Sequence, residues 1–316
     1  MEDEQKHLPF FALPDRAMQL CELAGIPQVS RVCNPHLVLY CSPMGGSEEA
    51  GRAANEAITL DAGDAGGPAM FATIAALRAV PDWRRTLMTH YSCLDENGDG
   101  GFLARLHYPD GTPHPAVLHW ASEEHYLRAS MYMTLPALHA SASMIPPAEE
   151  KQFRFARQFS LTSGSLVSTA PGAARTLALT GVCRLRPPGC PWVETHRPEG
   201  VEANPDFYDE ANIREVTWRA KVARYTQHAP SARALLATGR ALLTAQTVWC
   251  PQVLEIGTMA VRTLLQTHPG LVAQNGGQGG APPGATPAPA EHVANQVPHP
   301  LALTDGLAAV PGAGPR

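Results

Sequence analysis

Two adjacent carboxylates, Glu123 and Glu124, stand between two large aromatic rings, Trp120 and Tyr126. A carboxylate in such surroundings can stabilise an oxocarbenium-like sugar or activate a water, and an aromatic wall can stack a base and exclude solvent. These residue types suit the hydrolysis of a C–N glycosidic bond. We therefore expect Glu124, with Glu123 as the second catalytic candidate, to act as a general base or a charge stabiliser. The alternative is that both glutamates only complement the positive end of a helix at the surface.

A β-hairpin must bring Trp120 to this position. Two β-prone runs cover 102–108 and 116–120. The intervening Pro109-Asp-Gly-Thr is a turn sequence, so the segment predicts two antiparallel strands. The second strand is expected to end at Trp120.

A helix must then carry the acidic pair. Ser122 is a favourable N-cap, and the two glutamates follow in the first turn, where the helix dipole favours negative charge. The helix is expected to run to about Thr134 and to stop before Pro136. Its periodicity places Glu124 and Arg128 on one face, which makes Arg128 a candidate for contact with substrate.

Three later helices are predicted, and they supply the other candidate binding residues. The first covers 210–227, the second begins at Pro230 and ends at Gly239, and the last is marked by the apolar positions 254–265. Trp218 and Arg224 on the first of these helices, and Trp249 before the last, are expected to bind substrate with Trp120 and Tyr126.

The chain is expected to form one α+β domain, predominantly helical and compact, with a short β-hairpin or small sheet. This domain covers 86–268 and carries an insertion near 184–204, which is dense in Pro and Gly. Residues 1–85 are expected to be an N-terminal extension packed on it, with helices over 15–24 and 48–58, a strand over 36–41 and a helix over 69–80. The Pro/Gly/Ala-rich tail 269–316 is expected to be disordered.

Composition excludes several classes of function. The 316 residues carry a formal net charge of −5 without a basic run, which gives no electrostatic footprint for a nucleic-acid backbone. No apolar window reaches the length of a membrane helix, and the charged N-terminus does not resemble a signal peptide. We expect a cytoplasmic protein whose partner is a small molecule.

Neither metal nor cofactor is expected. The run Asp95-Glu-Asn-Gly-Asp-Gly100 matches half of a calcium loop, but Leu106 occupies the twelfth position, which favours a polar turn. The seven cysteines contain no Cys-x-x-Cys pair, which favours free thiols in a reducing compartment. The alternative is that the turn between Cys183 and Cys190 brings these two together.

Several blocks resemble one known family in order and spacing over roughly residues 90–267. Trp120-Ala-Ser-Glu-Glu-His-Tyr-Leu-Arg-Ala129 resembles the Trp-Pro-Thr-Ser-Glu-His-Tyr-Phe-Gln-Ala signature of the NADAR superfamily, also called the YbiA-like family. Pro171-Gly-Ala-Ala-Arg175 is similar to its Ser-Pro-x-x-Ala-Lys segment. The block 224–239 is similar to its Lys-Phe-x-Gln-His/Asn…Leu-Leu-x-Thr-Gly block, and 254–262 to its closing helix.

The resemblance implies a divergent NADAR-like domain with N-glycosidase activity on a ribosyl or ADP-ribosyl, nucleotide-like substrate. By position, Glu124 matches the motif glutamate, Trp120 the preceding tryptophan and Trp249 a late tryptophan. The chain departs from the family at Met131, where a lysine is expected, and at Ala245, where a glutamate is expected.

Three hypotheses therefore stand. The first is a hydrolase that cleaves an N-glycosidic bond with Glu124. The second is a degenerate domain that binds ADP-ribose or a nucleotide without turnover, which the departures from the family favour. The third is a helical interaction protein in which the acidic pair is ordinary surface.

Overall fold

The computed structural model describes residues 34–41, 67–80, 82–133, 147–187, 189–247 and 250–273. The helices expected over 15–24 and 48–58, and the tail beyond Ala273, lie outside these residues, as does Trp249. Within the described residues, no helix is both long enough and apolar enough to span a membrane.

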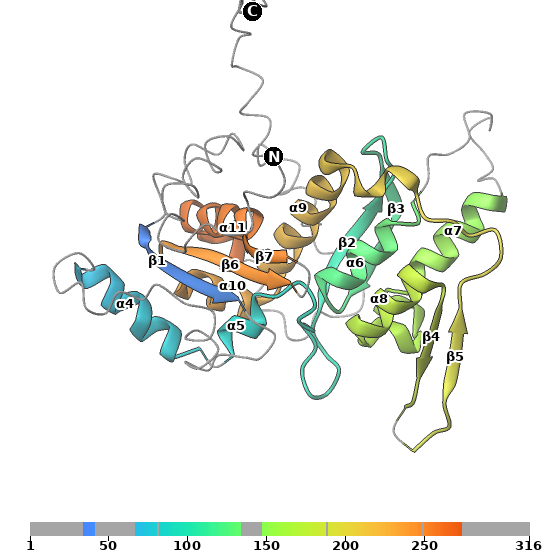
Figure 1. The fold of residues 1–316 in the computed structure, drawn as a ribbon, viewed down its shortest axis with the longest axis horizontal. Helices are drawn as coiled ribbons and strands as arrows, with labels where there is room; N and C mark the ends of the chain where they lie inside the picture. The colour runs from blue at the N-terminus through green and yellow to red at the C-terminus, as the bar shows by residue number, and fades with distance from the viewer. Residues whose placement is uncertain are drawn as a thin grey trace, which may run out of the picture.

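A three-stranded sheet forms the centre of one half of the fold (Figure 1). Its strand order is β1 (Asn34–Cys41), β6 (Ala241–Thr247) and β7 (Cys250–Leu254). β1 pairs with β6 in parallel, and β7 pairs with β6 antiparallel. The strand expected over 36–41 is therefore confirmed, and this part of the N-terminal segment belongs to the same sheet as the C-terminal strands.

Four helices pack around this sheet: α4 (Gly67–Arg78), α5 (Trp83–Thr86), α10 (Ala229–Ala237) and α11 (Ile256–Thr267). Their buried residues form a first hydrophobic core with Leu39, Leu243 and Met259. The guanidinium of Arg262 on α11 donates to the Thr238 hydroxyl and to the Ala241 carbonyl, each at 2.7 Å. These two bonds attach α11 to the end of α10 and the start of β6.

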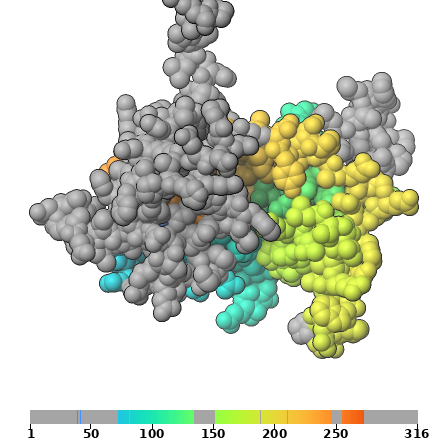
Figure 2. Space-filling model, in the orientation of Figure 1, coloured from blue at the N-terminus to red at the C-terminus, as the bar shows by residue number. Residues whose placement is uncertain are grey.

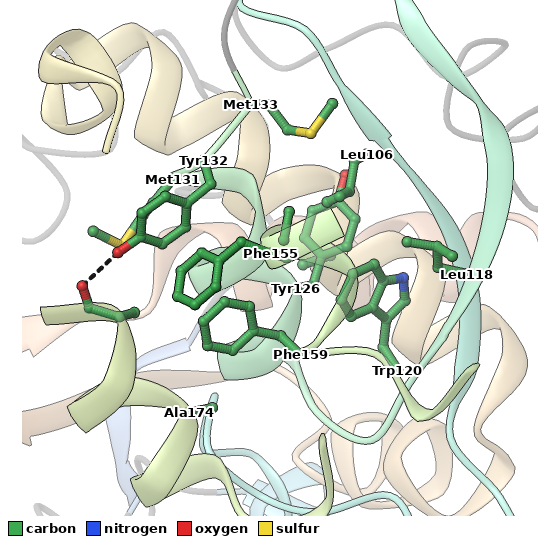
Figure 3. Close-up of a cluster of buried hydrophobic side chains, with 14 of the residues drawn as sticks. Leu106, Leu118, Trp120, Tyr126, Met131, Tyr132, Met133, Phe155, Phe159 and Ala174 are labelled. Atoms are coloured by element: carbon green, nitrogen blue, oxygen red, sulfur yellow. Dashed lines mark hydrogen bonds between the residues drawn. The ribbon is translucent and has the colours of Figure 1, made fainter. Parts of the chain in front are cut away.

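A second core lies beside an antiparallel hairpin of β2 (Phe102–His107) and β3 (Pro113–Trp120). The helices α6 (Glu123–Ser130), α7 (Pro147–Arg157) and α8 (Pro171–Thr180) complete it. Figure 3 shows its aromatic centre, in which the Tyr132 hydroxyl donates to the Ala178 carbonyl at 2.6 Å. The predicted hairpin is confirmed, because alternate residues of β2 are buried against this core.

Helix α9 (Glu210–Gln227) packs against both cores and has the bounds that the sequence predicts. Trp218, Val222 and Tyr225 enter the first core, whereas Ala220 and Ala223 enter the second. At its C-terminal end the Gln227 amide accepts from the Leu103 N–H and donates to the Leu103 carbonyl, both at 2.8 Å. This side chain satisfies backbone groups of β2 that the hairpin leaves unpaired.

The Pro/Gly-dense segment expected near 184–204 contains part of a second hairpin, made of β4 (Val182–Leu185) and β5 (Val193–His196). This hairpin projects from the second half of the molecule (Figures 1 and 2). Trp192, just before β5, is 65% exposed.

Among the described residues, four more short helices connect these elements. They are η3 (Leu161–Ser163), η4 (Leu166–Thr169), η5 (Pro205–Tyr208) and α12 (Gly270–Ala273). The described residues thus form an α+β fold with a parallel strand pair that the sequence analysis does not anticipate.

Candidate functional site

The helix that carries the acidic pair begins as the sequence predicts. The Ser122 side chain caps it by accepting from the His125 N–H at 3.4 Å, and the Glu124 N–H donates to the Thr89 carbonyl at 3.0 Å. The helix ends at Ser130, four residues before the expected Thr134. Because successive residues of a helix point 100° apart, the two carboxylates face different surroundings.

Glu123 is completely buried and paired with cations of α9. Its Oε1 accepts from Arg224 Nη1 at 2.7 Å, and its Oε2 lies 3.4 Å from Lys221 Nζ. Lys221 also donates to Glu255 Oε2 at 3.2 Å and to the Thr258 hydroxyl at 2.8 Å. We call Glu123, Lys221, Arg224 and Glu255 the buried ionic network.

Opposite charges of the buried ionic network stabilise one another. Burial acts to lower the pKa of Lys221, but the carboxylates of Glu123 and Glu255 raise that pKa above its ordinary value. Burial acts to raise the pKa of Glu255, but Lys221 and hydrogen bonds from Thr258 and Lys221 hold it below its ordinary value. The charged forms of Lys221 and Glu255 are therefore favoured by their partners in the network.

Glu124 faces a different and more accessible region. Its side chain is 7% exposed, and its Oε1 accepts from Arg128 Nε and Nη2, each at 2.8 Å. Arg128 Nη1 donates to the Tyr208 hydroxyl at 3.3 Å and to the Met131 sulfur at 3.4 Å. Because Tyr208 is 58% exposed, this group of side chains opens to solvent at its edge.

His90 lies near Glu124, and Arg175 lies near His90. Burial lowers the pKa of the half-buried His90, and the charge of Glu124 opposes this by raising it. The charges of Arg85, Arg175 and Arg224 lower the pKa further. The sequence analysis does not select His90 or Tyr208, because no motif marks them, but Arg175 ends a block that resembles the NADAR family. We call Glu124, Arg128, His90, Arg175 and Tyr208 the candidate site.

Trp120 and Tyr126 point away from this site into the second core (Figure 3). The Trp120 ring is fully buried, and its Nε1 donates to the Ala104 carbonyl at 3.0 Å. The Tyr126 ring packs edge-on against it with ring centroids 5.4 Å apart, and its hydroxyl donates to the Arg105 carbonyl at 2.9 Å. The structure therefore does not support a stacking role for either ring, because no ring face is open to a ligand.

Two further binding candidates are also buried. Trp218 belongs to the first core, and Arg224 has no exposed surface. Arg224 contacts Glu123 instead of solvent, so direct contact between Arg224 and a substrate is not supported either. Of the residues expected to bind substrate, the structure brings Arg128 alone beside Glu124 among those that it describes.

One hollow lies between the β2–β3 turn, the end of α6 and the start of α9. It is a cavity of about 50 Å³, lined by His107, Ser130, Phe207 and Arg219 among others, and Glu124 is not part of its wall. Pockets for drug-sized ligands are typically several times larger, at roughly 300–1,000 Å³. This cavity is too small for a nucleotide.

The turn at Asp95 is a polar turn without a calcium ligand set. Its carboxylate accepts from the N–H groups of Asn97 and Asp99 at 2.8 and 2.9 Å. No group of three or more His, Cys, Asp or Glu with metal-binding geometry occurs among the described residues. Cys183 and Cys190 are both free, with Cys183 buried and Cys190 exposed.

Comparison of the chain with family models, with curated proteins and with solved structures finds no match in any of the three. The function is therefore inferred from the residues and their geometry.

Proposed function

We propose that the protein is a hydrolase that cleaves the N-glycosidic bond of a ribosyl or ADP-ribosyl, nucleotide-like substrate at Glu124. The observation that carries this proposal is the position of the Glu124 carboxylate. It is largely shielded from water, fixed at the start of a helix, paired with Arg128 and close enough to His90 to act on its pKa. The resemblance of the segment 120–129 to the NADAR signature supports the same assignment.

The proposed reaction needs few groups. The C–N bond breaks and the leaving base takes the electron pair, while water attacks the anomeric carbon and gives its proton to the Glu124 carboxylate. The negative charge of Glu124 also stabilises the oxocarbenium-like sugar. Arg128 and Arg175 supply positive charge suited to the phosphates of a nucleotide-like substrate.

A second candidate function is binding of ADP-ribose or a nucleotide without turnover. It is favoured by the contact between Glu124 and Arg128, whose two nitrogens both donate to Oε1. Because Oε1 already accepts from two nitrogens of Arg128, this oxygen is less available to a substrate water. Met131, which stands where the family has a lysine, is buried and adds no charge to the site.

The test is incubation with ADP-ribosylated guanosine, followed by chromatography for the two products, guanosine and ADP-ribose. We expect the native chain to release guanosine and Glu124→Gln to do so about 100-fold or more slowly, since general-base catalysis contributes roughly 10²–10⁴-fold. Glu96→Gln is the matched control, because Glu96 is an exposed carboxylate in the Asp95 turn.

Three outcomes separate the hypotheses. Turnover that survives Glu124→Gln removes Glu124 from the catalytic role. Thermal stabilisation by ADP-ribose without release of guanosine supports the binding function instead. If ADP-ribosylated guanosine is not cleaved and neither ADP-ribose nor other nucleotides stabilise the chain, the helical interaction protein is the remaining hypothesis.

A further inference from the structure

We infer that Arg224, oriented by Glu123, is a positioning residue that fixes the segment 86–91 against the start of α6 and so places His90 next to Glu124. This inference rests on the proposed function only for the identity of the reaction. The positioning itself concerns contacts within the chain.

The contacts of Arg224 define this role. Its Nη1 donates to the Met88 carbonyl at 2.9 Å as well as to Glu123, and its Nη2 donates to the Thr86 carbonyl. Its Nε and Nη2 lie 3.2 Å from the Ser231 hydroxyl on α10. One buried guanidinium thus joins α9, α6, α10 and the segment that follows α5.

The segment held in this way carries His90 of the candidate site and a carbonyl that binds the backbone of Glu124. The Thr89 carbonyl accepts from the Glu124 N–H, and His90 is the next residue along the chain. The guanidinium also lies over the Tyr91 ring, 5.5 Å from its centroid. Residues on both sides of Thr89 and His90 are therefore attached to the same side chain.

An arginine is required because of its geometry. The planar guanidinium presents five N–H donors in a fixed arrangement, whereas a lysine ammonium presents three donors at one point. Here the donors reach two carbonyls, one carboxylate and one hydroxyl. A lysine at this position keeps the charge and the contact to Glu123 but cannot reach both carbonyls.

The decisive variant is Arg224→Lys, and its readouts are the pKa of His90 and hydrogen exchange of the Glu124 amide, both by NMR. We expect the pKa of His90 to rise toward the ordinary histidine value, because a released segment exposes the imidazole to water. We expect the Glu124 amide to exchange faster, because its acceptor belongs to that segment. Both readouts are independent of catalysis.

Thr258→Val is the matched control. Thr258 is equally buried, and its hydroxyl bonds to Lys221 and Glu255 and not to the segment 86–91. Its removal weakens the buried ionic network without touching the contacts of Arg224. We therefore expect both NMR readouts to stay at their native values in Thr258→Val.

A second variant covers the case in which Arg224→Lys does not fold. In Glu123→Leu/Arg224→Met two apolar side chains replace the buried pair, an exchange that proteins often tolerate. The readout of this variant is the Glu124 amide, which is expected to exchange faster; the pKa of His90 is not used here, because loss of the Arg224 charge raises it directly. Unchanged readouts in a folded Arg224→Lys or in this double variant overturn the inference and leave Arg224 a purely structural residue.

Turnover of ADP-ribosylated guanosine gives a third readout. In Arg224→Lys we expect kcat to fall on the order of 100-fold with a much smaller change in KM, as for a displacement of about 1 Å in a catalytic group. If the native chain has no turnover, the proposed function fails while the two NMR readouts still decide the positioning role.

Discussion

Substitution of Trp120 distinguishes a core tryptophan from a ligand-stacking one. The ring has no exposed surface, donates one hydrogen bond to Ala104 and packs on Tyr126. Trp120→Ala should cost about 3–5 kcal/mol through the cavity it leaves. Trp120→Phe should cost about 2 kcal/mol, of which about 1 comes from the lost hydrogen bond and the rest from the smaller ring.

Urea unfolding followed by circular dichroism measures these changes as shifts of the midpoint at constant slope. Trp192→Phe is the control, because Trp192 is 65% exposed and its replacement should change the free energy of unfolding by less than about 0.5 kcal/mol. Any nucleotide affinity should be the same in Trp120→Phe and in the native chain. Native stability of Trp120→Phe combined with lost affinity would refute the assignment of this ring to the core.

Three further predictions concern other positions. Burial lowers the pKa of His125 to about 4, so below pH 6.5 the unfolded chain takes up a proton that the folded chain does not. The free energy of unfolding should therefore fall by about 3 kcal/mol as pH falls from about 6.5 to 4. In His125→Gln, the free energy of unfolding should depend less steeply on pH over this range. Gly100→Ala should destabilise the chain by more than about 1 kcal/mol in chemical denaturation, since a Cβ there collides with a backbone carbonyl, whereas Gly98→Ala meets only the cost of its positive φ. Burial raises the pKa of the Cys41 thiol to about 12, whereas Cys190 is exposed. Iodoacetamide should therefore label Cys190 faster than Cys41 in the folded chain, as measured by mass spectrometry. Equally fast labelling of Cys41 would contradict this prediction.

Local sequence signals predict the elements around the site well. The Pro-Asp-Gly-Thr turn between two β-prone runs predicts the β2–β3 hairpin, and Ser122 predicts the start of α6. Helix α9 begins and ends at the predicted residues. These features depend on periodicity, turn chemistry and capping, which act over a few neighbouring residues.

The roles of individual side chains are less accessible to sequence. The parallel pairing of β1 with β6 joins strands about 200 residues apart, and no local pattern specifies it. The buried state of Arg224 follows from the same long-range packing, because its partners come from three separate segments. A charged residue on a predicted helix is ordinarily assigned to solvent or ligand, and only the complete fold shows a buried partner.

The adjacent glutamates show what each level of information decides. The sequence alone determined that both stand in the first turn of a capped helix, because capping and helix-dipole interactions are local. Only the tertiary structure decided that Glu123 is enclosed by Lys221 and Arg224 while Glu124 faces Arg128 and the exposed Tyr208. The physical reason is that a rotation of 100° between neighbours turns one side chain toward α9 and the other toward the edge of the protein, and the position of α9 is fixed by contacts between residues distant in the chain.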